Sequence, residues 1–164
     1  MFVTETAEKI KSMEIRGAGR IAREAAEALR RQADEIPLSD LEFFCREMRG
    51  AAQTLVATRP TAVSLPNAVH FVMSGLERAT TPDEARTGVI NRAEQFIQTS
   101  RHAVENIAQF GARHIRDGDT LLTHCNSEAA LGCIIEAHRS GKEIGLCNRS
   151  ATPEPGAYYY QSAQ

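Results

Sequence analysis

The first 115 residues alternate apolar and polar positions with the period of an α-helix rather than that of a strand. After Gly17 and Gly19, apolar side chains recur every three or four positions, and arginine and glutamate lie mostly between them. This apolar stripe consists of Ile21, Ala25, Ala28 and Leu29. Because alanine-rich composition also favours helices, we predict a helix that begins at the two glycines.

Later helices carry start and stop signals as well as an apolar stripe. Ser39 or Asp40 can cap the N-terminus of the next helix, and Pro60 prevents its continuation. A further stripe follows at Leu65, Val69, Val72 and Leu76. A long helix then begins with Thr81 as its cap and Pro82 at its first position. We therefore predict a mostly α-helical N-terminal domain.

The pattern changes after Gly118. Residues 119–124 form a short apolar run that predicts a strand, and residues 143–148 predict a second strand. Between them, residues 126–142 predict a helix that Asn126 or Ser127 can cap. Strand, helix and strand in this order are typical of a parallel α/β unit. The predicted domains are a helical domain over residues 1–115 and the β-α-β start of a Rossmann-like α/β domain over residues 116–148.

The last stretch, residues 149–164, differs from everything before it. It contains two prolines and three consecutive tyrosines, without an alternation that would complete a sheet. Such a composition is typical of a terminus without regular structure. We predict a disordered tail that does not look native to the α/β domain.

Composition and charge describe an ordinary soluble chain. Hydrophobic residues make up 42% of it and charged residues 24%, with a formal net charge of −2, which argues against a nucleic-acid-binding surface. No apolar run approaches the ~20 residues that span a bilayer, and the N-terminus lacks the apolar core of a signal peptide. We predict a cytoplasmic protein with no nucleic-acid or membrane partner.

The chain contains four scattered cysteines, Cys45, Cys125, Cys133 and Cys147, too few for a disulfide framework. No pair has the C-x₂-C spacing of a structural zinc site, so we predict no metal site. A small buried apolar residue is the default interpretation of each. Cys125 has a second interpretation, because it lies between a predicted strand and a predicted helix. A thiol pKa can fall there and the group can exchange protons, so both interpretations of Cys125 stay open.

Two stretches are candidates for binding a phosphate. The first consists of Arg16, Gly17, Ala18 and Gly19. It precedes a predicted helix, where glycine backbone N–H groups and the helix N-terminus favour an anion. The second is Arg59, on a rigid connection between a helix end and a proline. Each has a plainer interpretation, the first as a turn and the second as a surface arginine at a helix C-terminus.

Three motifs together resemble one family. They are IRGAGRIA, TRPTAVSLPNAV and GDTLLTHCNSEAALG, in this order, across roughly residues 14–144. The family they resemble is the translation initiation factor 2B regulatory-subunit superfamily, which also contains methylthioribose-1-phosphate isomerases and archaeal ribose-1,5-bisphosphate isomerases. The combination looks most like the last branch, since methylthioribose-1-phosphate isomerases more usually carry a proline-containing form of the first motif.

The resemblance implies an aldose–ketose isomerisation of ribose 1,5-bisphosphate to ribulose 1,5-bisphosphate in AMP metabolism. Cys125 and a downstream aspartate would exchange protons with the sugar, without a metal or a nicotinamide cofactor. Besides the two stretches above, the resemblance implies phosphate contacts from Ser127, Glu128 and Ala129. Glu128 stands where the isomerases often have lysine. A carboxylate near a phosphate is unfavourable, so only the backbone of Glu128 would contribute.

The resemblance also implies a sugar bisphosphate substrate, AMP as a candidate activator, and homo-oligomers in full-length relatives. No aspartate follows Asp119, so the second acid is absent from this chain. We expect a truncated, inactive isomerase, and we hypothesise that a single-base frameshift near Gly145 produced residues 145–164. Sequencing the gene across codon 145 tests this, because an uninterrupted frame with codons incompatible with the shifted reading removes the hypothesis.

Two other functions stay open. One is a regulatory or binding protein akin to the initiation factor 2B subunits, which contact initiation factor 2, and the other is a helical interaction domain without a ligand. Binding of ribose 1,5-bisphosphate or AMP would indicate the isomerase, whereas binding of the initiation-factor α subunit would indicate the regulatory protein. Cys125 together with both phosphate motifs favours the enzyme lineage, since a pure scaffold does not need them.

Overall fold

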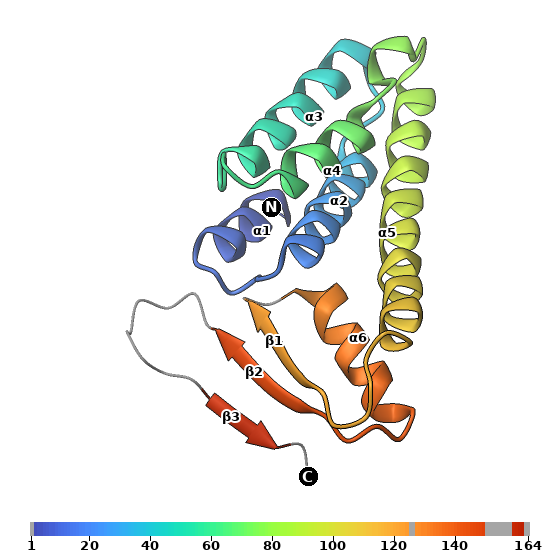
Figure 1. Ribbon diagram of the computed structural model, residues 1–164. Coiled ribbons are helices and arrows are strands. Elements are labelled where there is room, and N and C mark those ends of the chain that lie inside the picture. Colours follow the sequence, from blue (N-terminus) through green and yellow to red (C-terminus); the bar gives the residue numbers. More distant parts are fainter. Residues whose placement is uncertain (1, 125–126, 150–158, 163–164) are drawn as a thin grey trace. The chain divides into compact units, whose positions relative to one another are not determined.

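The computed structural model describes residues 2–124, 127–149 and 159–162 of the chain (Figure 1). The chain divides into two compact units, Met1–Ser100 and Arg101–Gln164, and each is described by itself. The division lies inside the longest helix, whereas the sequence predicts a boundary after residue 115. The reason is that the last turns of this helix pack within the second unit, where an added Cβ at Gly132 would lie 3.1 Å from Cβ of Ala108.

The first unit is a group of helices joined by short loops. Its elements are α1 (Phe2–Lys11), α2 (Ala18–Glu35), α3 (Leu41–Val56), α4 (Ser64–Met73), the short 3₁₀ helix η1 (Leu76–Arg78) and most of α5 (Pro82–Ala112). Helix α2 packs against α1, α3 and α4. Figure 1 shows that α2, α3 and α4 run in alternating directions, as short connections between helices require.

The core of this unit confirms the two predicted stripes. Ile21, Ala25, Ala28 and Leu29 are all buried, and so are Leu65, Val69, Val72 and Leu76. Helix α5 adds a buried stripe at Ala85, Val89, Ala93 and Ile97, which joins the same cluster. Leu76 is buried from η1 rather than from α4, because Gly75 adopts a left-handed φ of 86° and separates the two.

The predicted helix starts are also confirmed. Asp40 caps α3, since its Oδ2 accepts a hydrogen bond of 2.7 Å from the backbone N–H of Phe43. Thr81 caps α5, since its Oγ1 accepts from the N–H of Glu84 at 3.2 Å. The Glu84 carboxylate in turn accepts from the N–H and the hydroxyl of Thr80, both at 2.9 Å. Side chains thus satisfy N–H groups that the first turn of a helix leaves unpaired.

The second unit contains the predicted strand, helix and strand. Strand β1 (Thr120–His124) pairs in parallel with β2 (Gly145–Arg149), and α6 (Glu128–Arg139) connects them. Figure 1 shows α6 against one face of this pair. The side chain of Leu122, which points to the other face, is 73% exposed, whereas the next residue, Thr123, is buried. The alternation indicates a sheet that is covered on one side only.

The tail differs from the expectation. Strand β3 (Tyr159–Ser162) pairs antiparallel with β2, so the described sheet has the order β1-β2-β3. Tyrosine favours strands, and β2 offers an unpaired edge. The predicted disordered tail therefore contains a strand at this position. Among the described residues, no helix is both long enough and apolar enough to cross a membrane.

Candidate functional site

The stretch Arg16–Gly19 forms the entry to α2. Gly17 is the N-cap residue, with a φ of 86° that other residues rarely adopt, and it offers no side chain to cap the helix. The N–H of Ile21 bonds back to the Gly17 carbonyl at 2.9 Å, so the helix begins at Ala18. The first N–H groups of α2 therefore have no capping side chain, which leaves them available to an anion.

Arg16 is held beside this helix start. Its Nε donates a hydrogen bond of 2.8 Å to the carbonyl of Met13, and the side chain is otherwise exposed. Met13 itself has a left-handed φ of 64°, which turns the chain back between α1 and α2. The remaining guanidinium nitrogens of Arg16 have no acceptor within the part of the chain that the structure describes. A phosphate at the start of α2 would provide one.

Arg59 lies in the connection between α3 and α4. The hydroxyl of Thr58 donates to the Leu55 carbonyl at 2.6 Å, and the Arg59 carbonyl accepts from the N–H of Ala62 at 3.1 Å. These bonds and the following proline make the connection a tight turn. The Arg59 guanidinium, which is half-buried, makes no hydrogen bond or ion pair with any described residue. It is therefore a charged donor group without an acceptor in the part of the chain that the structure describes.

The two arginine-bearing loops lie at the same end of the first unit. Helix α2 begins two residues after Arg16, and α4 begins five residues after Arg59. Helix α3, between them, runs in the opposite direction to both (Figure 1). Because the directions alternate, the N-termini of α2 and α4 point to one end (Figure 1). Both helix N-termini carry positive potential, which adds to that of the two arginines. This end of the unit is suited to bind an anion.

The second unit carries the other predicted residues, after β1. Cys125, the predicted catalytic residue, lies outside the described residues. Ser127 is the N-cap of α6, and its Oγ accepts from the N–H of Ala130 at 3.3 Å. Glu128 and Ala129 follow in the first turn, both half-buried. The prediction that Asn126 or Ser127 caps this helix is therefore confirmed for Ser127.

Thr123 is a residue of this region that the sequence analysis does not single out. Its side chain is 4% exposed, and its Oγ1 has no hydrogen-bond partner among the described residues. A buried hydroxyl without a partner is costly, so it is uncommon in a folded protein. Its place at the carboxyl end of a parallel strand is where α/β sheets bind ligands. Strand alternation alone would have marked it as inward-facing.

The predicted residues thus form two sets. Arg16–Gly19 and Arg59 belong to the first unit, and Ser127–Ala129 belong to the second. Within the first unit, the structure brings the two loops to one end of the helices. Among the described residues, no three histidine, cysteine, aspartate or glutamate side chains gather as a metal site would require.

Comparison with known proteins identifies the family. The family model described as the initiation factor 2 subunit family matches residues 14–154. The chain belongs to the initiation factor 2 subunit family. One similar protein is the ribose 1,5-bisphosphate isomerase of Methanocaldococcus jannaschii, which is 49% identical over 157 residues. That match covers 96% of this chain and 50% of the relative, so the chain spans about half the length of this curated relative.

Solved structures agree with the assignment to the initiation factor 2 subunit family. Translation initiation factor eIF-2B subunit delta from A. fulgidus matches with a TM-score of 0.72 and 27% identity, over 89% of this chain and 45% of that one. The 5-methylthioribose 1-phosphate isomerase of Pyrococcus horikoshii matches with a TM-score of 0.75 and 29% identity, over 85% and 42%. The fold is therefore shared by proteins named as isomerases and as initiation-factor subunits.

Proposed function

We propose that this chain is the N-terminal part of a ribose 1,5-bisphosphate isomerase. The observation that carries the proposal is the 49% identity to a protein of that name, against 29% to a methylthioribose 1-phosphate isomerase and 27% to an initiation-factor subunit. Within one family, the branch with the highest identity across nearly the whole chain is the best guide to chemistry. Two guanidinium groups support it, because a bisphosphate needs two anion sites. Among the described residues, the terminal nitrogens of Arg16 and the whole guanidinium of Arg59 have no acceptor.

In this proposal the β1-α6-β2 unit is the start of a Rossmann-like domain. The parallel pairing of β1 and β2 supports that assignment, and so does the exposed face at Leu122, which further helices of such a domain would cover. Cys125 and Ser127 would then follow the carboxyl end of β1. The loops of Arg16 and Arg59 would bind phosphate groups of the sugar.

The proposed reaction moves protons within the sugar and opens its ring. A base removes the proton from carbon 2 while the bond between carbon 1 and the ring oxygen breaks, and an acid protonates that oxygen, which becomes the hydroxyl of carbon 4. Carbon 1 of the resulting cis-phosphoenolate then gains a proton as the carbon 2 hydroxyl loses its own, and the product is the 2-keto sugar bisphosphate. No electrons are gained or lost overall, so no redox partner is required. Two groups of matched pKa are needed, and Cys125 would be one of them. The second group, an aspartate in the resemblance, has no counterpart after Asp119.

The proposal predicts that the 164-residue chain binds the bisphosphate but does not turn it over. Calorimetric titration with ribose 1,5-bisphosphate tests the binding, and Arg59→Gln should weaken it at least about tenfold through the loss of a charge-assisted hydrogen bond. Arg49→Gln is the matched control, because Arg49 is an exposed arginine of α3 that pairs only loosely with Glu77, at 3.7 Å. Equal affinity in all three proteins contradicts the proposal.

A second candidate is a regulatory protein related to the initiation-factor subunits. The match to the A. fulgidus delta subunit, with a TM-score of 0.72, favours it. Pull-down with the α subunit of initiation factor 2 separates the two candidates. Retention of that subunit, together with no binding of ribose 1,5-bisphosphate, selects the regulatory protein. Robust isomerase turnover that Cys125→Ser abolishes would show instead that the chain is a working enzyme.

A further inference from the structure

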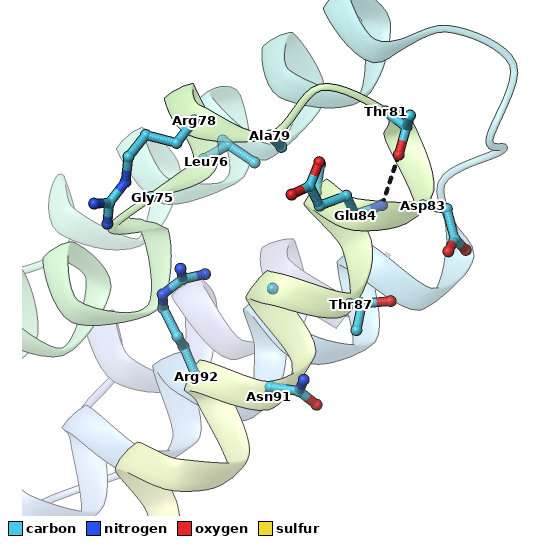
Figure 2. A pocket seen from close by; sticks show the side chains of 12 residues that line it. Gly75, Leu76, Arg78, Ala79, Thr81, Asp83, Glu84, Thr87, Asn91 and Arg92 are labelled. Atoms are coloured by element: carbon cyan, nitrogen blue, oxygen red, sulfur yellow. Dashed lines mark hydrogen bonds between the residues drawn. The ribbon is translucent and has the colours of Figure 1, made fainter.

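A cavity of about 480 Å³ opens in the first unit where α4 ends and α5 begins (Figure 2). Its walls are the segment Gly75–Ala79 and the first three turns of α5. The loops of Arg16 and Arg59 lie beyond the other end of α4. Ten residues of helix separate the two ends, which is about 15 Å at the usual rise. The cavity is thus a different place from the candidate site above.

Two guanidinium groups meet in this cavity. An ideal Cβ on Gly75 would lie 3.1 Å from Cζ of Arg92 and 3.3 Å from Nη2 of Arg78. Both groups therefore reach the same point of the backbone. Figure 2 shows that they approach it from different elements, Arg78 from η1 and Arg92 from α5. Two like charges at such close range repel each other unless an anion lies between them.

Neither guanidinium has an acceptor among the residues that the structure describes. Two carboxylates, those of Asp83 and Glu84, line the side of the cavity that lies opposite the two arginines in Figure 2. Glu84 accepts two hydrogen bonds from Thr80, at 2.9 Å each, and Glu77 pairs with Arg49. Asp83 lines the cavity, but its carboxylate points away from both arginines in Figure 2. The arginine end of the cavity is therefore positively charged.

Two glycines make this arrangement possible. A Cβ on Gly88 would lie 2.8 Å from Nη1 of Arg92, and a Cβ on Gly75 would overlap the same guanidinium. Glycine inside a helix is unfavourable relative to alanine, yet Gly88 occupies the second turn of α5. The space that it leaves is filled by the Arg92 guanidinium. The groups that contact the backbone at Gly75 and Gly88 are therefore charged side-chain ends rather than apolar side chains.

We propose that Arg78 and Arg92 bind a phosphate group in this cavity. Guanidinium groups donate paired N–H bonds that match the oxygens of a phosphate, and two of them can hold one dianion from two sides. The phosphate is either free inorganic phosphate or the end of a small phosphate ester. The cavity volume exceeds that of a phosphate alone, so we assign the ester as the ligand and the remaining space to its organic part.

The test is a titration of the full chain at constant ionic strength, followed by ¹H–¹⁵N NMR. The ligands are inorganic phosphate and ribose 5-phosphate, and the protein carries Arg16→Gln and Arg59→Gln so that the first candidate site does not contribute. We expect saturable shifts of the Gly75 and Gly88 amides with both ligands. Tighter binding of ribose 5-phosphate supports the ester, and equal binding would replace the ester by free phosphate as the ligand.

Variants of the cavity make the test decisive. In this background Arg92→Gln and Arg78→Gln should each raise the Kd at least tenfold, whereas Arg46→Gln, at an exposed arginine of α3 that pairs with Glu47, should leave it unchanged. Gly88→Ala should raise the Kd as well, because the new methyl group displaces the Arg92 guanidinium while alanine favours the helix. Circular dichroism checks that each variant stays folded. Absence of saturable shifts, or an unchanged Kd in both Arg92→Gln and Gly88→Ala, overturns the proposal.

Discussion

The side chain of Cys133 on α6 packs directly against the backbone of Gly111 on α5. A Cβ added to Gly111 would overlap Sγ of Cys133 and would lie 3.2 Å from its Cβ. The thiol donates a hydrogen bond of 3.3 Å to the carbonyl of Ile107, one turn earlier on α5. Cys133 is therefore a packing residue, although it is half-buried rather than buried as predicted, and Gly111 permits the close approach of the two helices.

Replacing Gly111 by alanine should destabilise the protein by about 1–2 kcal/mol, because crowding at the thiol outweighs the helix preference of alanine. Chemical denaturation measures the change. Gly50 of α3 provides the matched control, since nothing lies within 4 Å of an added Cβ there, and Gly50→Ala should stabilise by up to about 1 kcal/mol. Adding Cys133→Ala to Gly111→Ala should restore part of the loss, and strict additivity would contradict the contact.

Lys142 closes the end of α5. Its Nζ donates hydrogen bonds of 2.7 Å to the carbonyl of Ala112, the last residue of the helix, and to that of Ile115, three residues beyond it. Lys142→Met keeps the aliphatic stem but removes both bonds, so we expect a loss of about 1–3 kcal/mol. Lys11→Met, on the exposed surface of α1, should change stability by less than about 0.5 kcal/mol. Equal effects of the two would show that the bonds contribute nothing.

Glu27 gives the protein a predictable dependence on pH. Hydrogen bonds from Arg30, and then from Arg31, lower the pKa of its carboxyl from 4.5 to about 2. A depressed folded pKa contributes stability that is fully present above pH 4.5 and is lost as the pH falls toward 2. Because the Glu27 side chain is 28% exposed, we expect about 1 kcal/mol from this group.

Urea unfolding of Glu27→Gln against the parent protein measures this contribution. The difference in unfolding free energy should be greatest at neutral pH and should shrink between pH 4.5 and the lowest pH at which both proteins fold. Glu8→Gln, at an exposed position of α1, is the control for replacing a helical glutamate that makes no ion pair with any described residue. A difference that stays constant over this range would mean that the Arg30 bond does not depend on the charge of Glu27.

Glu128 is the position where the sequence departs from the pattern it resembles. It lies in the first turn of α6, directly after the Ser127 cap. If this turn binds a phosphate, Glu128→Lys should strengthen binding of ribose 1,5-bisphosphate by about tenfold, because repulsion becomes attraction. Titration calorimetry at two salt concentrations measures it. Glu136→Lys, at the other end of the same helix, should have no comparable effect, and equal gains in both would indicate general attraction only.

Thr123 offers a test that separates binding from folding. Its buried Oγ1 has no partner in the described part of the chain, so Thr123→Val removes an unsatisfied group while keeping the shape of the side chain. We expect stability to stay the same or rise by about 1 kcal/mol. If the hydroxyl contacts the substrate, the same variant should bind ribose 1,5-bisphosphate several-fold more weakly. A loss of stability would instead show a hydrogen bond within the protein.

The local signals in the sequence were strong enough to predict most elements. Asp40, Thr81 and Ser127 each cap the helix that the sequence predicts them to start, because capping depends on residues within one turn. The stripe from Ile21 to Leu29 is buried as its period requires. The strand at Tyr159–Ser162 was missed, because its pairing with β2 depends on an edge far away in the sequence.

The candidate site was predictable only in part. The motif around Gly17 and the loop of Arg59 stand out in the sequence, since glycines before a helix and an arginine on a rigid loop are both suited to bind an anion. The unpartnered hydroxyl of Thr123 and the meeting of Arg78 with Arg92 do not stand out. Each depends on which side chains from distant elements are absent or close by.

The sequence by itself determined the helices, the parallel β-α-β unit and the family, because these follow from period, caps and motifs within short segments. Tertiary structure alone decided which groups lack partners and which glycines make room for others. In the sequence, Gly88 and Gly111 are only residues that weaken a helix. In the structure, Gly88 makes room for the Arg92 guanidinium and Gly111 makes room for the Cys133 side chain. The reason is physical: burial, pairing and close contact are properties of surfaces brought together by folding.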